Sequence, residues 1–173
     1  GTDVPVVLDV MIHDIDLILS FINSPIKTIH ASGIGLFTKS IDIANARLEF
    51  ENGAIANVTS SRVSLKLERK IRFFQKDSYI SLDFQAKQAR VIKKSPKIMK
   101  YLPQIMMGAT DIDPEKLVDQ QVYDCSDGPQ DALSMELASW VEAISMDKRP
   151  VVDGEAGTKA LSVAMQILKI IDE

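Results

Sequence analysis

Residues 5–22 read PVVLDVMIHDIDLILSFI, and this stretch predicts a helix that is apolar on almost every side. At about 100° per residue, Asp9, His13 and Asp16 fall within an arc of roughly 60° and form one polar stripe. Burying ionisable groups costs free energy unless they are paired or used in chemistry. The stripe on this helix is therefore either a satisfied structural network or the wall of an active site.

The composition, with 46% hydrophobic and 25% charged residues over 173 residues, is that of one globular domain with a buried core. A net charge of −4 and the scarcity of aromatic residues argue against a nucleic-acid partner. Cys125 is the single cysteine, which excludes an internal disulfide and favours a reducing compartment such as the cytoplasm. No apolar run has the length of a membrane span, so we expect no membrane partner.

The pattern after the first helix is that of antiparallel strands. Alternation over residues 41–50 places Ala44, Ala46, Leu48 and Phe50 on one face, and Asn52-Gly53 predicts a type I′ hairpin turn. The opposite face mixes apolar and polar residues, which favours contact with another subunit. The complete set of predicted strands covers residues 26–37, 41–50, 54–63, 70–75, 79–84, 89–94 and 120–123.

Two helices, over residues 131–146 and 155–171, are predicted to close the chain. Residues 95–119 predict a long loop with one helical turn at 114–118. This order predicts an α+β fold, with an open, mostly antiparallel sheet of about six strands and helices packed on one face. We expect residues 1–173 to form one domain.

The residues alone leave the polar stripe open to three interpretations: a structural network, a metal site or an acid–base site. A metal site is disfavoured because His30 is the only other histidine of the chain. Arg62 lies at the end of a predicted strand and is either a surface or interface arginine or a ligand for an anionic group. Gly33-Ile34-Gly35 lacks a third glycine and a following helix, which predicts a bulged strand and no cofactor-binding turn.

The sequence resembles a known family at three places. These are the pattern Asp9-x-x-x-His13-x-x-Asp16, the turn EFENGAIANVTSSR at 49–62 and the closing VVDGEAGTKALSVAMQILKII at 151–171. Together they resemble the C-terminal domain of the Gfo/Idh/MocA family of nicotinamide-dependent sugar oxidoreductases. The resemblance covers essentially the whole chain. It implies a glyceraldehyde-3-phosphate dehydrogenase-like C-terminal domain for substrate binding and oligomerisation.

The resemblance also implies what this chain lacks. In the family, a separate N-terminal Rossmann domain binds NAD or NADP, and no such domain is present in residues 1–173. The first residue is glycine, which fits a fragment of a longer protein. We therefore expect residues 1–173 alone to bind no cofactor and no metal, and to be inactive as an enzyme.

The matched motif implies roles for individual residues. His13 is expected to be the general acid/base on the alcohol that becomes a carbonyl, and Asp9 to hydrogen-bond the substrate or His13. Asp16 is expected either to contact the substrate or to support the helix, and Arg62 is the further candidate for substrate binding. The expected partners are a sugar or UDP-sugar and further copies of the chain, in a homodimer or homotetramer built through the open sheet face.

Three segments carry a narrower resemblance: MIHDIDL at 11–17, SSRVS at 60–64 and RKIRFFQKDSYISLDF at 69–84. They are similar to a bacterial branch of the family associated with nucleotide-sugar oxidation, such as UDP-N-acetylglucosamine 3-dehydrogenases. The alternative from a different functional class is a non-catalytic dimeric α+β module for sugar binding or interaction.

Overall fold

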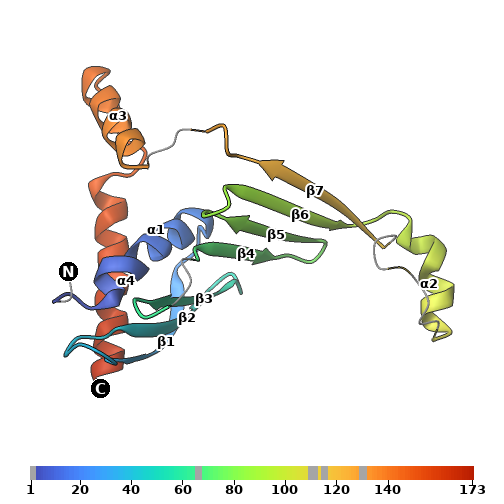
Figure 1. The fold of residues 1–173 in the computed structure, drawn as a ribbon, viewed down its shortest axis with the longest axis horizontal. Helices are drawn as coiled ribbons and strands as arrows, with labels where there is room; N and C mark the ends of the chain where they lie inside the picture. Colours follow the sequence, from blue (N-terminus) through green and yellow to red (C-terminus); the bar gives the residue numbers. More distant parts are fainter. Residues whose placement is uncertain (1–2, 65–67, 109–112, 114–116, 129–131) are drawn as a thin grey trace. The chain divides into compact units, whose positions relative to one another are not determined.

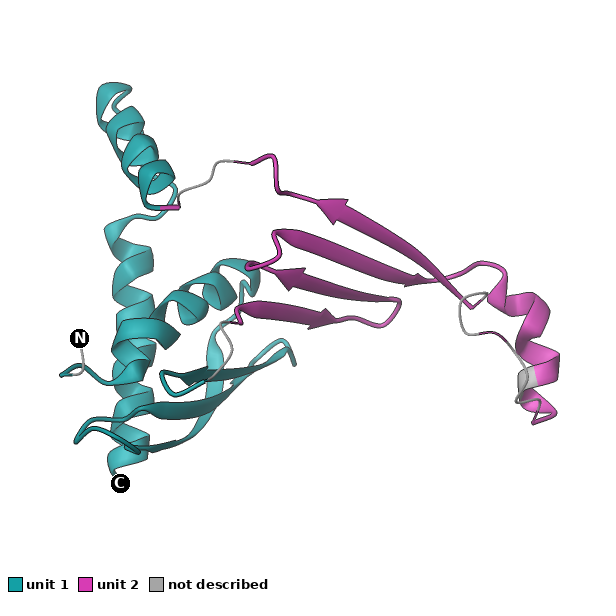
Figure 2. Cartoon of the chain, viewed as in Figure 1, with its two compact units in different colours: residues 1–65, 133–173 teal, residues 66–132 magenta. Residues whose placement is uncertain are grey.

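The computed structural model describes residues 3–64, 68–108, 113, 117–128 and 132–173. The chain divides into two compact units (Figure 2), of which unit 1 holds residues 1–65 and 133–173 and unit 2 holds residues 66–132. The α+β class is confirmed, and all strand pairs are antiparallel. The strands group as one sheet of three and one of four, where the sequence predicted a single sheet of about six.

The sheet of unit 1 has the order β1 (Ile26–Ile34), β2 (Ile43–Phe50) and β3 (Ile55–Ser61). Burial along β2 alternates as predicted, with Ala44, Ala46, Leu48 and Phe50 buried. The predicted type I′ turn is wrong in type, because only Gly53 has a positive φ, at +85°, whereas that turn needs two such residues. The turn is longer, and a hydrogen bond from the Phe50 N–H to the Ala54 carbonyl closes it at 2.9 Å.

Helices cover one face of this sheet (Figure 1). The predicted first helix is found as a π-helical turn, η1 (Val7–Met11), followed by α1 (Ile12–Phe21). Both pack on the sheet together with α4 (Gly154–Asp172), while α3 (Ala132–Ser145) buries Ala143 but contributes no residue to the core cluster that these elements share. The buried core residues are Val6, Val7, Met11, Ile15, Ala44, Ala46, Leu48, Phe50, Val58, Ala160, Val163, Ala164 and Ile167.

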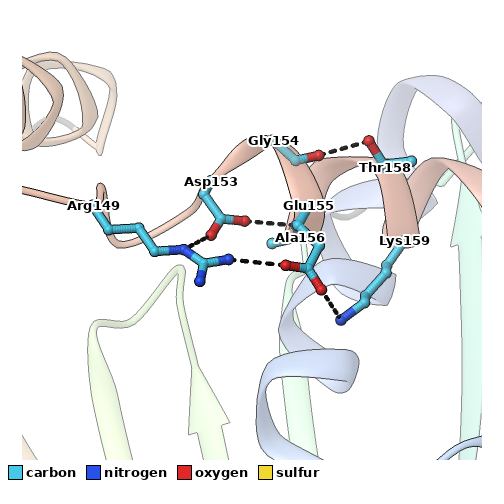
Figure 3. A network of polar contacts seen from close by, with 7 residues as sticks. All are labelled: Arg149, Asp153, Gly154, Glu155, Ala156, Thr158 and Lys159. Atoms are coloured by element: carbon cyan, nitrogen blue, oxygen red, sulfur yellow. Dashed lines mark hydrogen bonds and ion pairs between the residues drawn. The ribbon is translucent and has the colours of Figure 1, made fainter.

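The start of α4 is fixed by a capping residue and a set of ion pairs (Figure 3). Asp153 accepts a hydrogen bond from the Ala156 N–H at 2.9 Å, which satisfies one of the unpaired donors of the first turn and lowers the pKa of the Asp153 carboxyl. Arg149 pairs with both Asp153 and Glu155, and Lys159 pairs with Glu155 at 2.9 Å. These contacts explain why the helix begins at Gly154.

The outer face of the unit 1 sheet mixes polar and apolar side chains, as predicted. Asn45 donates to Thr59 at 2.6 Å, and Arg47 donates to Glu49 at 2.9 Å. The apolar residues Ile34 and Ile55 are exposed nearer its edges. Gly33 pairs regularly with Ala44, and the irregularity of β1 lies between Ile26 and Thr28, so the bulge predicted at Gly33-Ile34-Gly35 is wrong.

Unit 2 consists of β4 (Lys70–Phe74), β5 (Ser78–Asp83), β6 (Gln88–Lys94) and β7 (Val118–Asp124), paired in that order, with the helix α2 (Ile98–Met106). The sequence missed α2, because Pro103 lies inside it and proline normally ends a helix. The helical turn predicted at 114–118 falls mostly on residues outside the described ranges. None of the described hydrophobic side chains of unit 2 is buried.

Candidate functional site

The polar stripe lies on the side of the first helix that faces away from the core. Within η1 the Ile12 N–H bonds to the Val7 carbonyl, five residues earlier, and this wider turn is a feature found often at functional sites. Val7, Met11 and Ile15 are buried at intervals of four, whereas Asp9 and His13 are exposed. The predicted burial of the stripe is therefore wrong, because the sheet covers one side of the helix only.

Two predicted site residues from distant parts of the sequence meet here. Arg62, just after β3, places Nη2 at 3.2 Å from Asp9 Oδ2 and also donates to the backbone carbonyl of Val4. The Arg62 side chain is 16% exposed and the Asp9 side chain 44% exposed, so Arg62 is mostly buried and Asp9 faces the solvent. Arg62 thus holds both the start of the helix and the Asp9 carboxylate in place.

The backbone at Ile41 and Asp42 joins the elements that carry this pair. The Ile41 carbonyl accepts the Val6 N–H at 2.9 Å, which fixes the entry into the helix. The Asp42 carbonyl accepts the Arg62 N–H at 3.0 Å, and the Asp42 N–H donates to the Ile34 carbonyl at 2.9 Å. The position of the Asp9–Arg62 pair therefore depends on two residues just before β2.

The Asp42 side chain is buried and organises the loop before it. Its Oδ2 accepts the backbone N–H groups of Leu36, Phe37 and Thr38 at 2.9, 2.8 and 3.0 Å, and its Oδ1 accepts the Thr38 hydroxyl at 2.8 Å. These donors, above all the Phe37 N–H, lower the pKa of the Asp42 carboxyl from 3.8 to about 2. No sequence pattern predicts this role of Asp42, since backbone N–H groups are its main partners.

We predict that Asp42→Asn destabilises unit 1 at neutral pH and lowers its melting temperature by several degrees, because an amide replaces an acceptor of four hydrogen bonds. The folded-state pKa lies below the ordinary value, so the stabilisation is present above pH 3.8 and is lost as the pH falls towards about 2. Thermal unfolding at a series of pH values checks this. The exposed Asp3 offers a matched Asp3→Asn control, and an equal effect of both variants would contradict the prediction.

The other residues of the polar stripe, His13 and Asp16, lie further along the same helix. His13 and Asp16 follow Asp9 on the same helix, with His13 exposed and Asp16 half-buried. Ser20, one turn further, donates its hydroxyl to the Leu17 carbonyl of the same helix at 2.7 Å. The structure therefore brings Asp9 and Arg62 into contact and keeps His13 accessible on the same exposed face.

The described residues of unit 1 also form a groove away from the polar stripe. A groove of about 710 Å³ in unit 1 is lined by the end of α1, the start of β1 and one side of α4, and it includes none of the four predicted site residues. The described residues contain no group of three or more His, Cys, Asp or Glu side chains that could hold a metal ion. Of the described helices, none combines the length and apolarity needed to cross a membrane.

Comparison with known proteins shows where the fold of this chain occurs elsewhere. The family model described as the GFO/IDH/MocA C-terminal domain matches residues 4–77, which include Asp9, His13, Asp16 and Arg62. The crystal structure of UDP-N-acetylglucosamine 3-dehydrogenase from Acidithiobacillus ferrooxidans superposes with a TM-score of 0.81 and 28% identity, over 98% of this chain and 49% of that chain. The chain has the fold of a GFO/IDH/MocA C-terminal domain.

This domain spans about half the length of the relatives it matches. The curated sequence of the same Acidithiobacillus ferrooxidans enzyme is 28% identical over 165 residues, which are 95% of this chain and 48% of the relative. An NAD-binding protein from Listeria innocua shares the fold at 16% identity, with a TM-score of 0.70 over 97% of this chain and 49% of that chain. The resemblance to the GFO/IDH/MocA C-terminal domain that the sequence predicted is thus confirmed.

Proposed function

We propose that this chain is the substrate-binding half of a nicotinamide-dependent dehydrogenase that oxidises a hydroxyl group of a sugar or nucleotide sugar. The observation that carries the proposal is the exposed helix face bearing Asp9 and His13, with Asp9 held by Arg62, in a domain of this family. The relative that matches across 95% of the chain acts on UDP-N-acetylglucosamine, which favours a UDP-sugar as substrate. We infer that the active protein is a longer polypeptide with a second, cofactor-binding domain.

The cofactor's own binding site is not expected in this chain. Its pyrophosphate is normally held by a glycine-rich turn at the start of a helix. Gly33 lies in β1 and Gly35 begins a loop that leads to β2, so neither fits that role. When bound in its own domain, NAD or NADP supplies the acceptor for a hydride.

His13 is the residue of this chain suited to move the proton. Oxidation of an alcohol removes a hydride from carbon and a proton from oxygen, and the remaining electron pair completes the carbonyl. An imidazole exchanges protons near neutral pH, and the exposed His13 is accessible to a substrate hydroxyl. We assign the hydroxyl proton to His13 in oxidation, and the reverse transfer in reduction.

Asp9 and Arg62 would orient the substrate beside His13. The Asp9 carboxylate is held on one oxygen by Arg62 and remains partly exposed, which suits it to accept a hydrogen bond from a second hydroxyl. Nε and Nη1 of Arg62 are buried and have no hydrogen-bond partner among the described residues, so Arg62 would act on the substrate through the Asp9 carboxylate that its Nη2 holds. Asp16 is assigned a contact with the substrate or a supporting role one turn further along.

We predict that Arg62→Gln in the longer polypeptide lowers kcat/KM by about tenfold to a hundredfold, since a charge-assisted hydrogen bond to Asp9 is removed. Steady-state kinetics with a UDP-sugar would measure the loss. Arg90→Gln, at an exposed position of β6, is the control of the same chemistry and should leave kcat/KM unchanged. A similar loss in both variants would count against a role for Arg62 in the site.

Homo-oligomerisation through the outer face of the β1–β3 sheet is part of the proposal. This face is not covered by the helices of unit 1, and Ile34 and Ile55 are exposed on it. We predict that Ile55→Asp shifts the protein towards smaller species, because it places a charge in an apolar contact. Sedimentation velocity checks this, and a wild-type protein that is monomeric at every concentration would refute it.

Titration with nicotinamide nucleotides tests whether a second domain, and not residues 1–173, binds the cofactor. We expect residues 1–173 to bind neither NAD nor NADH at micromolar concentration, and the longer polypeptide to bind one of the nicotinamide cofactors. Isothermal titration calorimetry on both proteins measures this directly. Tight binding to residues 1–173 alone would overturn the two-domain assignment.

A further inference from the structure

Helix α3 carries an apolar face that no other described element of unit 1 covers. At about 100° per residue, Leu137, Trp140, Val141 and Ile144 lie within an arc of roughly 100°, the width by which amphipathic helices pack on a core. We call these four residues the α3 stripe. Their exposed fractions are 53%, 57%, 55% and 62%.

The α3 stripe is more apolar than the rest of the helix surface. Glu142 lies about half a turn away from Ile144 and belongs to the opposite, mostly small and polar face. Ala143 of α3 is buried but lies outside the core cluster of unit 1, to which α4 contributes four residues. A continuous apolar stripe of this kind indicates a contact surface.

We propose that the α3 stripe packs against the cofactor-binding domain of the same longer polypeptide, and so fixes the two halves of the enzyme to each other. This inference rests on the proposed function. The occupant is indicated by length, since this chain covers 48% of the curated relative and 49% of its crystal structure, leaving about half of each enzyme outside the matched region.

The size of the stripe favours an attached domain over a second copy. A helix of 14 residues is about 21 Å long, and one face of it offers far less than the ~800 Å² per partner of a standard interface between separate proteins. A domain in the same polypeptide needs no such area, because the connection raises its effective concentration to about the millimolar range. The α3 stripe is therefore large enough for contact between attached domains and too small for a stable dimer by itself.

Thiol labelling at two positions of α3 tests the proposal. In a background free of native cysteines, which in residues 1–173 requires only Cys125→Ser, Ile144→Cys places a thiol in the stripe and Glu142→Cys places one on the opposite face. We expect maleimide to label both positions rapidly in residues 1–173. In the longer polypeptide, we expect labelling at position 144 to slow by about tenfold or more and labelling at position 142 to stay fast.

Trp140 gives an independent readout that needs no introduced thiol. It is the chain's only tryptophan, so its emission in residues 1–173 reports on the stripe alone. The difference between the longer polypeptide and its Trp140→Phe variant isolates the same signal there. We expect this emission to shift to shorter wavelength, and acrylamide quenching to fall, in the longer polypeptide.

Each other outcome overturns the inference in a recognisable way. Equal labelling rates at positions 142 and 144 in a longer polypeptide that binds cofactor and turns over substrate would refute the packing and leave the proposed function intact. Protection of position 144 in residues 1–173 that grows with protein concentration would identify a second copy as the occupant. Failure of the longer polypeptide to bind any nicotinamide cofactor would instead refute the proposed function, and with it the identity of the occupant.

Discussion

Replacing His13 with asparagine is expected to lower kcat of the longer polypeptide by about 10²–10⁴-fold while leaving its melting temperature unchanged. Asparagine keeps a polar side chain but cannot exchange a proton with the substrate hydroxyl. The histidine is exposed, so its replacement removes no buried packing. Steady-state turnover and thermal unfolding, measured on the same preparation, separate a chemical role from a structural one.

His30 provides the matched control for this substitution. It is the only other histidine of the chain and is exposed on β1, opposite Arg47 in the sheet. His30→Asn should leave kcat within twofold or so of the wild-type value, since β1 contributes no residue to the proposed site. Unchanged turnover in His13→Asn, or a loss of stability without a loss of turnover, would favour the non-catalytic alternative.

The largest effect on stability is expected for Met11→Ala. Met11 is fully buried at the junction of η1 and α1, within the core formed with β2 and α4. Truncating a buried methionine removes apolar contacts and leaves a cavity, which costs about 2–5 kcal/mol. We expect the free energy of unfolding of residues 1–173, measured with urea, to fall by that amount.

Val10→Ala is the control for the Met11 substitution. Val10 precedes Met11 on the same π-helical turn but is 39% exposed, so its truncation removes few packed contacts. We expect a change of less than about 1 kcal/mol. Equal losses in the two variants would mean that the helix is buried on both sides, as the sequence had predicted and the structure contradicts.

Local patterns account for the parts of the fold that the sequence predicted. The period-two alternation of Ala44, Ala46, Leu48 and Phe50 identified the central strand and its buried face. The apolar spacing of Ala160, Val163, Ala164 and Ile167 identified the packed face of α4. These residues interact with their neighbours through the regular geometry of one element, and such regularity is visible in sequence.

Features that depend on tertiary partners were missed. The spacing of Asp9 and His13 showed that they share a helix face, but whether that face is covered depends on where the sheet lies. The contact of Asp9 with Arg62 joins residues 53 positions apart, and no local pattern encodes it. The π-helical turn, the buried Asp42 and the grouping of strands into two sheets arise in the same way, from contacts between elements.

The most direct test of the central claim is the reduction of nicotinamide cofactor by the longer polypeptide in the presence of UDP-N-acetylglucosamine or a related UDP-sugar. Absorbance of the reduced nicotinamide follows the reaction, and mass spectrometry identifies the oxidised sugar. We predict one reduced cofactor for each keto sugar formed, with the rate abolished or nearly so in His13→Asn. Binding of both ligands with no reduced cofactor for any sugar or UDP-sugar would contradict the assignment of this chain as the substrate-binding half of a dehydrogenase.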